Sequence, residues 1–242
     1  MKSVALILIS LFTGALAAQT PVNKIYPVSS GQKIFLRFDY PELVKISTWD
    51  KNEISIGGSV SINGGENDAA FELIQSNSGS TINIENKIRS LKELPHRITL
   101  LNKGEKITFK TKADFEKYCE ENGRNFNQRF EGVDMDILLE IKVPKNFEVK
   151  LESVYGMVEV KNYYGPLTVE AIYGGVDVTM QDKDAGELTA ETNYGQIYSN
   201  LDIKFSGSEF EDFHTYVSTK LGSGPNYSFE SKYGNVYLRK GL

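Results

Sequence analysis

A unit of the form Tyr-Gly-x-φ-x-φ, in which φ is an apolar residue, recurs in the second half of the chain. The first three copies start nine residues apart, whereas gaps of 21 and 39 residues precede the last two, weaker copies. A short unit cannot bury an apolar face alone and becomes stable by stacking on its neighbours. The repeat therefore predicts stacked strands. Its structural repeat residues are Tyr155, Gly156, Tyr164, Gly165, Tyr173, Gly174, Tyr194, Gly195, Tyr233 and Gly234.

The apolar residues change sequence parity at each glycine of the first three copies. Side chains two residues apart share one face of a strand, and the apolar set moves from odd positions before Gly156 to even positions at Val158 and Val160. It returns to odd positions after Gly165. Each glycine is expected to mark a bend or bulge, because glycine accepts positive φ and close backbone approach. The preceding tyrosine is expected to close its strand, with its ring packed toward the core.

These patterns predict an all-β fold built as a β-solenoid or a closely related stacked sheet, with an ordinary β-sandwich as the alternative. Calcium-binding β-rolls also have nine-residue repeats, but they need Gly-Gly-x-Gly-x-Asp in series. Here only Gly174–Asp177 comes near that pattern, so no calcium site is expected.

Three regions are expected to form one continuous domain over residues 22–242. Residues 22–111 alternate apolar and polar side chains between Gly, Asn and Asp clusters, as half-buried strands do. Residues 112–132 are predicted to be a helical insertion, and residues 133–242 hold the Tyr-Gly repeat.

The helix prediction depends on its two ends. Thr111 and Asp114 have the spacing of a capping box, and Gly123 stands where a helix commonly ends. This helix is expected to cover an open sheet edge or the end of the solenoid. The alternative is a lid over a partner or ligand.

Residues 1–18 have the pattern of a secretory signal peptide. Lys2 precedes an apolar run, and Ala15-Leu16-Ala17 forms a cleavage site. The apolar run is too short to cross a bilayer as a helix, which needs about 20 residues. We therefore expect an exported protein of the periplasm or cell surface, with no transmembrane segment in the mature chain.

Composition argues against several classes of protein. The 242 residues carry a net charge of −5, which gives no support to nucleic-acid binding. Two histidines and one cysteine leave too few ligands for a Cys/His zinc site and too few thiols for a disulfide framework. Phosphate-loop, nucleophile-elbow and His-Glu-x-x-His motifs are absent from the sequence. No catalytic, cofactor-binding or metal-binding residues are predicted, and no cofactor.

Cys119 and the pair Asp134 and Asp136 each allow a structural and a functional interpretation. Cys119 follows two aromatic residues on one helical face, so it is expected to be a small buried residue, with a reactive thiol as the alternative. Asp134 and Asp136 lack the further ligands of a calcium loop and fit the polar face of a strand.

Several segments resemble a known family. Ser30–Lys33, Ile46–Glu53 and Ser61–Gly65, together with the Tyr-Gly units, resemble the putative adhesins, exported Bacteroidetes-type proteins related to head-GIN domain proteins. The resemblance covers about residues 24–240, and its motifs are structural. It implies a right-handed β-helix-like protein of the cell envelope or surface.

Three functions follow as hypotheses. The first is a non-enzymatic, adhesin-like structural or interaction module, whose partners are envelope proteins or surface glycans. The second is a glycan-binding module that stacks sugars on exposed aromatic rings. The third is a polysaccharide-active β-helix enzyme, for which Glu159, Glu170 and Asp177 alternate outward between apolar positions.

Overall fold

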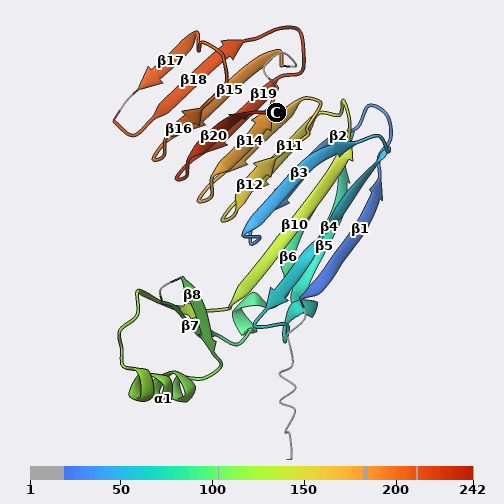
Figure 1. Ribbon diagram of the computed structural model, residues 1–242. Helices are drawn as coiled ribbons and strands as arrows, with labels where there is room; N and C mark the ends of the chain where they lie inside the picture. The colour runs from blue at the N-terminus through green and yellow to red at the C-terminus, as the bar shows by residue number, and fades with distance from the viewer. Residues whose placement is uncertain (1–18, 103, 182–184, 211, 242) are drawn as a thin grey trace, which may run out of the picture.

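The computed structural model describes residues 19–102, 104–181, 185–210 and 212–241, so the expected signal peptide lies outside the described residues. Two large β-sheets pack face to face, and a small third sheet with one α-helix lies beside them (Figure 1). Among the described residues, no helix is long and apolar enough to cross a membrane.

The first large sheet, called sheet A, has eight strands, and the second, sheet B, has nine. In spatial order sheet A contains β1 (Thr20–Pro27), β4 (Glu53–Ile62), β10 (Met135–Pro144), β3 (Leu43–Trp49), β12 (Met157–Val160), β14 (Val176–Met180), β20 (Val236–Lys240) and β16 (Ile197–Ser199). Sheet B contains β17 (Gly207–Phe210), β18 (Thr215–Lys220), β15 (Glu187–Thr192), β19 (Tyr227–Ser231), β13 (Leu167–Ala171), β11 (Val149–Ser153), β2 (Lys33–Phe38), β6 (Thr81–Ile88) and β5 (Phe71–Ser78).

Five times the chain runs along a strand of sheet B, turns a corner and returns along a strand of sheet A, and each such unit is called a rung here. Neighbouring rungs pair in parallel in both sheets. Their spatial order is β2–β3, β11–β12, β13–β14, β19–β20 and β15–β16, so the last rung of the sequence lies between two earlier ones. The parallel arrows of these rungs are plain in the upper part of Figure 1.

The prediction of a predominantly β fold is confirmed, whereas a regular solenoid is not shown. Antiparallel strands border the rungs at both ends, β1, β4 and β5 on one side and β17 and β18 on the other. Both large sheets are therefore mixed, and the rungs do not stack in chain order.

The core lies between sheets A and B and follows the predicted parity. In sheet B, Leu36, Leu151, Val169 and Phe229 stand side by side on successive strands, each at most 1% exposed. In sheet A, Val158 and Val160 are buried in the same core. The expected change of parity at the corner glycine is confirmed by these positions.

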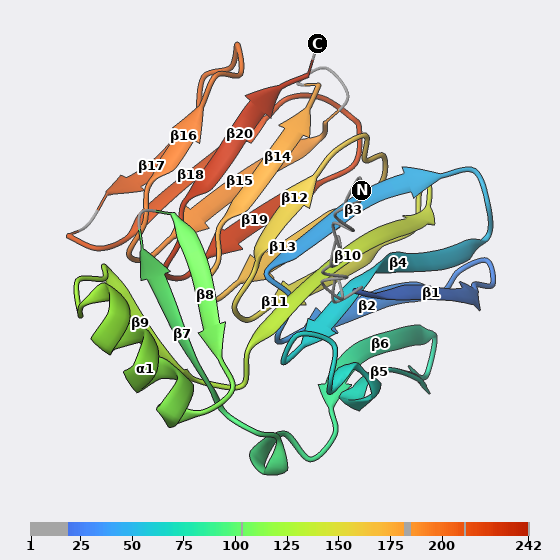
Figure 2. The ribbon, with the colours of Figure 1, turned by 60° about the horizontal axis from the view of Figure 1, so that its bottom comes forward.

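The small lobe, residues 97–132, has a core of its own. It contains β7 (Arg97–Asn102), β8 (Glu105–Phe109), α1 (Lys112–Asn122) and β9 (Gln128–Gly132), as seen beside the large sheets in Figure 2. The helix starts with the predicted capping box of Thr111 and Asp114. Phe115 and Cys119 pack against residues of β7, so α1 covers the small sheet. The expectation that the helix covers an open edge of a large sheet or the end of the solenoid is wrong. Two 3-10 turns, η1 (Asp68–Ala70) and η2 (Leu91–Glu93), complete the described elements.

Candidate functional site

The Tyr-Gly dipeptides lie at two opposite corners of the rungs. Tyr155, Tyr173, Tyr194 and Tyr233 each follow a strand of sheet B, whereas Tyr164 follows β12 of sheet A. One full rung therefore separates Tyr155 from Tyr173, which are 18 residues apart, and the nine-residue spacing joins opposite corners.

Glycine is required at the two corners for different reasons. At the corner between sheets B and A, a Cβ on Gly174 would overlap the carbonyl oxygen of Gly156 in the neighbouring rung. Gly156, Gly195 and Gly234 face the adjacent rung in the same way. At the opposite corner, Gly165 has a φ of 139°, which side-chain-bearing residues rarely adopt.

A buried hydroxyl group supports the corner in three of the rungs. Ser231 Oγ donates to the carbonyl oxygen of Gly174 at 2.7 Å and accepts from the Gly234 amide at 2.9 Å. Thr192 makes the equivalent pair of bonds to Gly234 and Gly195, and Ser153 Oγ donates to the Gly156 carbonyl. The Ser231 and Thr192 hydroxyls tie the corner backbone of one rung to that of its neighbour, whereas the Ser153 bond lies within its own rung. Sequence reasoning missed them, although a small residue stands two positions before the tyrosine in every copy at this corner.

Beyond the corner the aromatic rings form one continuous line, called the aromatic row. The rings of Tyr155 and Tyr173 stack with centroids 5.3 Å apart, those of Tyr173 and Tyr233 at 5.2 Å, and those of Tyr233 and Tyr194 at 5.0 Å. Tyr40 adds a ring at one end and Phe213 at the other. The full row, in spatial order, is Tyr40, Tyr155, Tyr173, Tyr233, Tyr194 and Phe213.

The expectation that these tyrosines face the core is wrong. Tyr155, Tyr173, Tyr194 and Tyr233 are 45–60% exposed, because the chain bends after the buried residue two positions earlier and carries the ring outward. The stacked rings are within 7–10° of parallel, so they cover one another's faces and present edges and hydroxyls to solvent. Such pre-ordered rings lose little conformational freedom when they contact a partner.

For two tyrosines, membership of the aromatic row differs from the list of repeat residues predicted from the sequence. Tyr40 belongs to the row but was not predicted, because Pro41 stands in place of the glycine after it. Its signal was its place two residues after the buried Phe38, as in the other copies. Tyr164, at the opposite corner, is 46% exposed and is not part of the row.

A row of glutamates runs beside the aromatic row on the outer face of sheet B. Glu152, Glu170, Glu230 and Glu191 stand opposite one another on successive strands. Each precedes its tyrosine by three residues, so the full repeat is Glu-small-x-Tyr-Gly. Lys150 contacts two of these carboxylates, at 3.0 Å for Glu152 and 2.8 Å for Glu170.

The charge of this glutamate row is only partly balanced. His214 Nε2 lies 2.9 Å from the Glu191 carboxylate. Burial raises the pKa of the Glu230 carboxyl, and the neighbouring Glu191 and Glu170 raise that pKa further. Like charges directly opposite in a sheet are destabilising, so this row opposes the stability of the fold.

The three acidic residues considered for an enzyme do not form one set. Glu159 and Asp177 face outward from sheet A, while Glu170 faces outward from sheet B. Each is in an ion pair, Glu159 with Lys161 and Asp177 with Arg239. Glu159 and Asp177 therefore stand opposite each other on neighbouring strands, each held in its own ion pair, and Glu170 lies on the other sheet.

Other candidate residues are placed as follows. Cys119 is a free, buried cysteine of the small lobe. Asp134 pairs with Lys106 at 2.7 Å, and Asp136 accepts a hydrogen bond from Gln19. Within the described parts of the chain, no group of three or more His, Cys, Asp or Glu residues could hold a metal ion.

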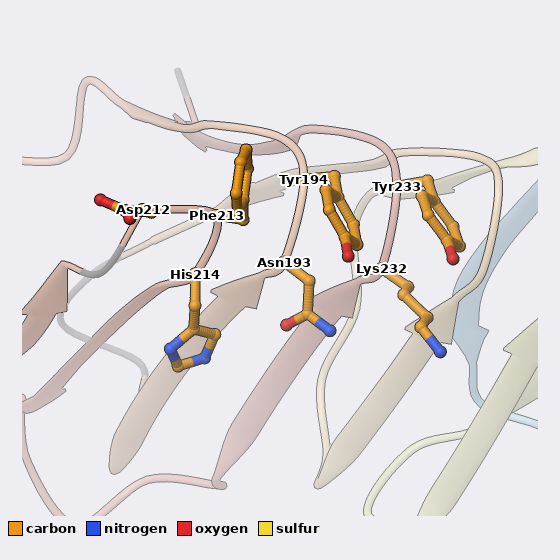
Figure 3. A pocket seen from close by; sticks show the side chains of 7 residues that line it. All are labelled: Asn193, Tyr194, Asp212, Phe213, His214, Lys232 and Tyr233. Atoms are coloured by element: carbon orange, nitrogen blue, oxygen red, sulfur yellow. The ribbon is translucent and has the colours of Figure 1, made fainter.

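An open groove lies at one end of the aromatic row and has a volume of about 710 Å³. Figure 3 shows the rings of Tyr233, Tyr194 and Phe213 in one line, with Lys232, Asn193 and His214 in a second line below them. At the other end of the row, Tyr40 and Tyr155 line a cleft of about 570 Å³ beside the small lobe. The aromatic row thus joins two hollows.

Comparison with known proteins gives limited similarity. No protein-family model matches the chain, and no curated protein matches it. It is similar to the crystal structure of a putative cell adhesion protein from Clostridium sporogenes, with 13% identity, a TM-score of 0.49, and coverage of 93% of this chain and 100% of that one. It is also similar to a putative adhesin from Bacteroides fragilis, with 12% identity, a TM-score of 0.22, and coverage of 93% and 99%. Both TM-scores are below 0.5, so neither neighbour assigns a function or ligand to this chain.

Proposed function

We propose that this chain is a non-enzymatic, exported interaction module of the cell envelope or surface, adhesin-like in function, and that the aromatic row is its contact surface. The observation that carries the proposal is the continuous line of exposed rings along one corner of the rungs. Tyrosine is enriched among the residues that dominate protein interfaces.

The distribution of exposed apolar side chains supports this assignment of the contact surface. Of the eleven large apolar side chains that are exposed in the described chain, seven lie along this corner: Tyr155, Met157, Ile172, Tyr173, Tyr194, Phe213 and Tyr233. Single exposed apolar residues are common, whereas a contiguous patch marks an interaction site. A purely structural stack would be served as well by rings turned toward the core.

The parallel rungs hold the rings of the aromatic row in place, because each tyrosine ring follows a strand of sheet B at the corner of its rung. We infer that they act as a short solenoid-like stack, in which each rung adds one ring at the spacing of neighbouring strands. Export is inferred from residues 1–18, and location in the periplasm or at the outer surface follows from it.

Glycan binding is the second candidate, favoured by one observation. The inner rings cover one another's faces and leave no face for a sugar, but Phe213 ends the row and is 70% exposed. It stands over the groove that Asn193 and His214 line, and side chains of these types form hydrogen bonds with hydroxyl groups. The Phe213 end of the row therefore offers a ring for a sugar to stack on.

Beads coated with the purified protein test the contact surface. They are expected to retain isolated cell envelopes, and the double variant Tyr173→Ser, Tyr233→Ser is expected to retain at least tenfold less. Tyr198→Ser is the matched control, because Tyr198 is 48% exposed but stacks on Tyr237 outside the row. Equal retention by all three proteins would overturn the proposal, and protease treatment of intact cells tests the location.

A further inference from the structure

The cleft between the small lobe and the large sheets combines aromatic rings with carboxylates. The lobe contributes Leu101, Lys106 and Phe130, and the body contributes Tyr40, Glu42 and Tyr155. Its volume is about 570 Å³, and ligand sites occur preferentially at such boundaries between packed units.

Polar contacts hold the two walls of this cleft together. Arg97 of the lobe, only 7% exposed, pairs with Glu66 of the body at 2.6 Å. Lys106 pairs with Asp134 at 2.7 Å. The buried Asn63 side chain of the body holds the two connections to the lobe: it donates to the carbonyl oxygen of Pro95, just before β7, at 2.9 Å and accepts from the Asp134 amide, just after β9, at 3.0 Å. These contacts fix the lobe beside the body.

The cleft carries uncompensated negative charge. The Asp134 and Glu131 carboxylates are paired with Lys106 and Arg129, respectively. Among the described residues, Glu42 is the cleft carboxylate without an ion pair. Burial raises the pKa of the Glu42 carboxyl, and the nearby Asp136 and Asp134 raise it further against the opposing charge of Lys106.

Aromatic rings lie beside this charge. Phe130 is 52% exposed on β9, and the rings of Tyr40 and Tyr155 are stacked with centroids 6.4 Å apart. The faces of aromatic rings attract ammonium and guanidinium groups, and carboxylates attract the same cations. Phe130, the terminal ring Tyr40 and the carboxylate therefore select the same chemical group.

We propose that this cleft binds a lysine or arginine side chain of a partner protein, presented on an extended segment that continues along the aromatic row. Charge complementarity identifies the basic group. The aromatic row indicates that the basic group belongs to a longer segment, because the first two rings of the row, Tyr40 and Tyr155, also line the cleft. The course of the segment along the row rests on the proposed function, whereas recognition of the basic group in the cleft does not.

A capped hexapeptide of alternating lysine and glycine is the probe, and calorimetric titration measures its binding to the whole chain. The peptide is expected to bind at least tenfold more tightly than the same peptide with glutamine in place of lysine. Glu42→Gln and Phe130→Ala are each expected to weaken binding at least fivefold. Glu187→Gln removes the same charge from an exposed position at the start of β15 and is expected to leave the affinity unchanged.

Several results would overturn the inference. The glutamine peptide could bind as tightly as the lysine peptide, or Glu187→Gln could weaken binding as much as Glu42→Gln, which would indicate general attraction to an acidic protein. Single lysine amide could bind as tightly as the hexapeptide, which would indicate a small-cation site and not a partner segment.

The two proposals fail separately. Loss of envelope retention in the double tyrosine variant, together with unchanged peptide affinity in Glu42→Gln, would support the contact surface and overturn the cleft. Peptide binding that depends on Glu42 and Phe130, together with unchanged envelope retention in the tyrosine variant, would overturn the contact surface and keep the recognition of a basic group.

Discussion

Ser231 Oγ donates a 2.7 Å hydrogen bond to the carbonyl oxygen of Gly174, which precedes it by 57 residues and belongs to the neighbouring rung. The same hydroxyl accepts from the amide of Gly234 in its own rung. One buried side chain therefore forms hydrogen bonds with an amide in the turn of its own rung and with a carbonyl group of the neighbouring rung. The exposed Tyr233 follows two residues after this buried link.

Ser231→Ala is expected to lower the free energy of unfolding by about 1–3 kcal/mol, the usual effect of leaving a buried polar group without a partner. Alanine itself fits the space, since Ala171 occupies the same place in the rung β13–β14. Ser228→Ala, on the outer face of the same strand, is the control and should change stability little. Equal urea midpoints for the two variants would contradict this role of the hydroxyl.

Gly174→Ala is expected to destabilise the fold by about 1–3 kcal/mol, the typical range for overpacking. The new Cβ would overlap the Gly156 backbone, which cannot move without shifting the whole rung. Gly132→Ala is the matched control, because nothing lies within 4 Å of a Cβ at that position. Thermal melts should separate the two variants by several degrees, and a Gly174 variant as stable as the control would refute the close packing of the corners.

Gly165→Val tests the opposite corner, where the strain comes from φ. A valine forced to a φ of 139° is expected to cost about 1–3 kcal/mol. Thr168→Val, at a half-buried outer position of the following strand, should have little effect. The same melting temperature for both variants would show that the corner does not depend on glycine.

Glu230→Gln tests the glutamate row through the pH dependence of stability. The folded-state pKa of Glu230 is raised above its ordinary value of 4.5, first by burial and then by Glu191 and Glu170. The folded state therefore holds this proton more tightly than the unfolded state, and stability falls as pH rises from the ordinary pKa through the raised one. The variant is expected to melt higher than the parent protein near neutral pH, and the difference should vanish below the ordinary pKa of 4.5.

Glu187→Gln is the control for this pH series, because it removes one charge from an exposed end of β15. A lower melting temperature for the Glu230 variant at neutral pH, or a difference that persists unchanged in acid, would contradict the prediction.

The sequence predicts features that depend on near neighbours along the chain. Alternation places Val158 and Val160 in the core, and the spacing of Thr111 and Asp114 specifies the start of α1. Pairing between strands is less accessible, because it depends on residues far apart in sequence. Nothing local indicates that β19 lies between β13 and β15.

The sequence predicts the candidate site only in part, because the site also depends on residues far apart in sequence. The Tyr-Gly repeat identifies the residues of the row, but the direction of each ring depends on where the chain bends relative to the last buried residue. Ser153 faces the core and Tyr155 does not, although they share parity, because the strand ends between them. Phe213 joins the row only through the folded arrangement, and Tyr40 lacks the glycine that marks the other copies.

The place of the rung β19–β20 between two earlier rungs has a consequence for how the molecule acquires its structure. A chain whose rungs stacked in order could fold progressively from one end as each segment became available. Here the rung β15–β16 has its neighbouring rung only once β19 and β20, which follow it in sequence, are available. The segment β19–β20 therefore connects the rung β15–β16 to the rest of the stack. Its removal would divide the aromatic row at Tyr233 and would not simply shorten the row at one end.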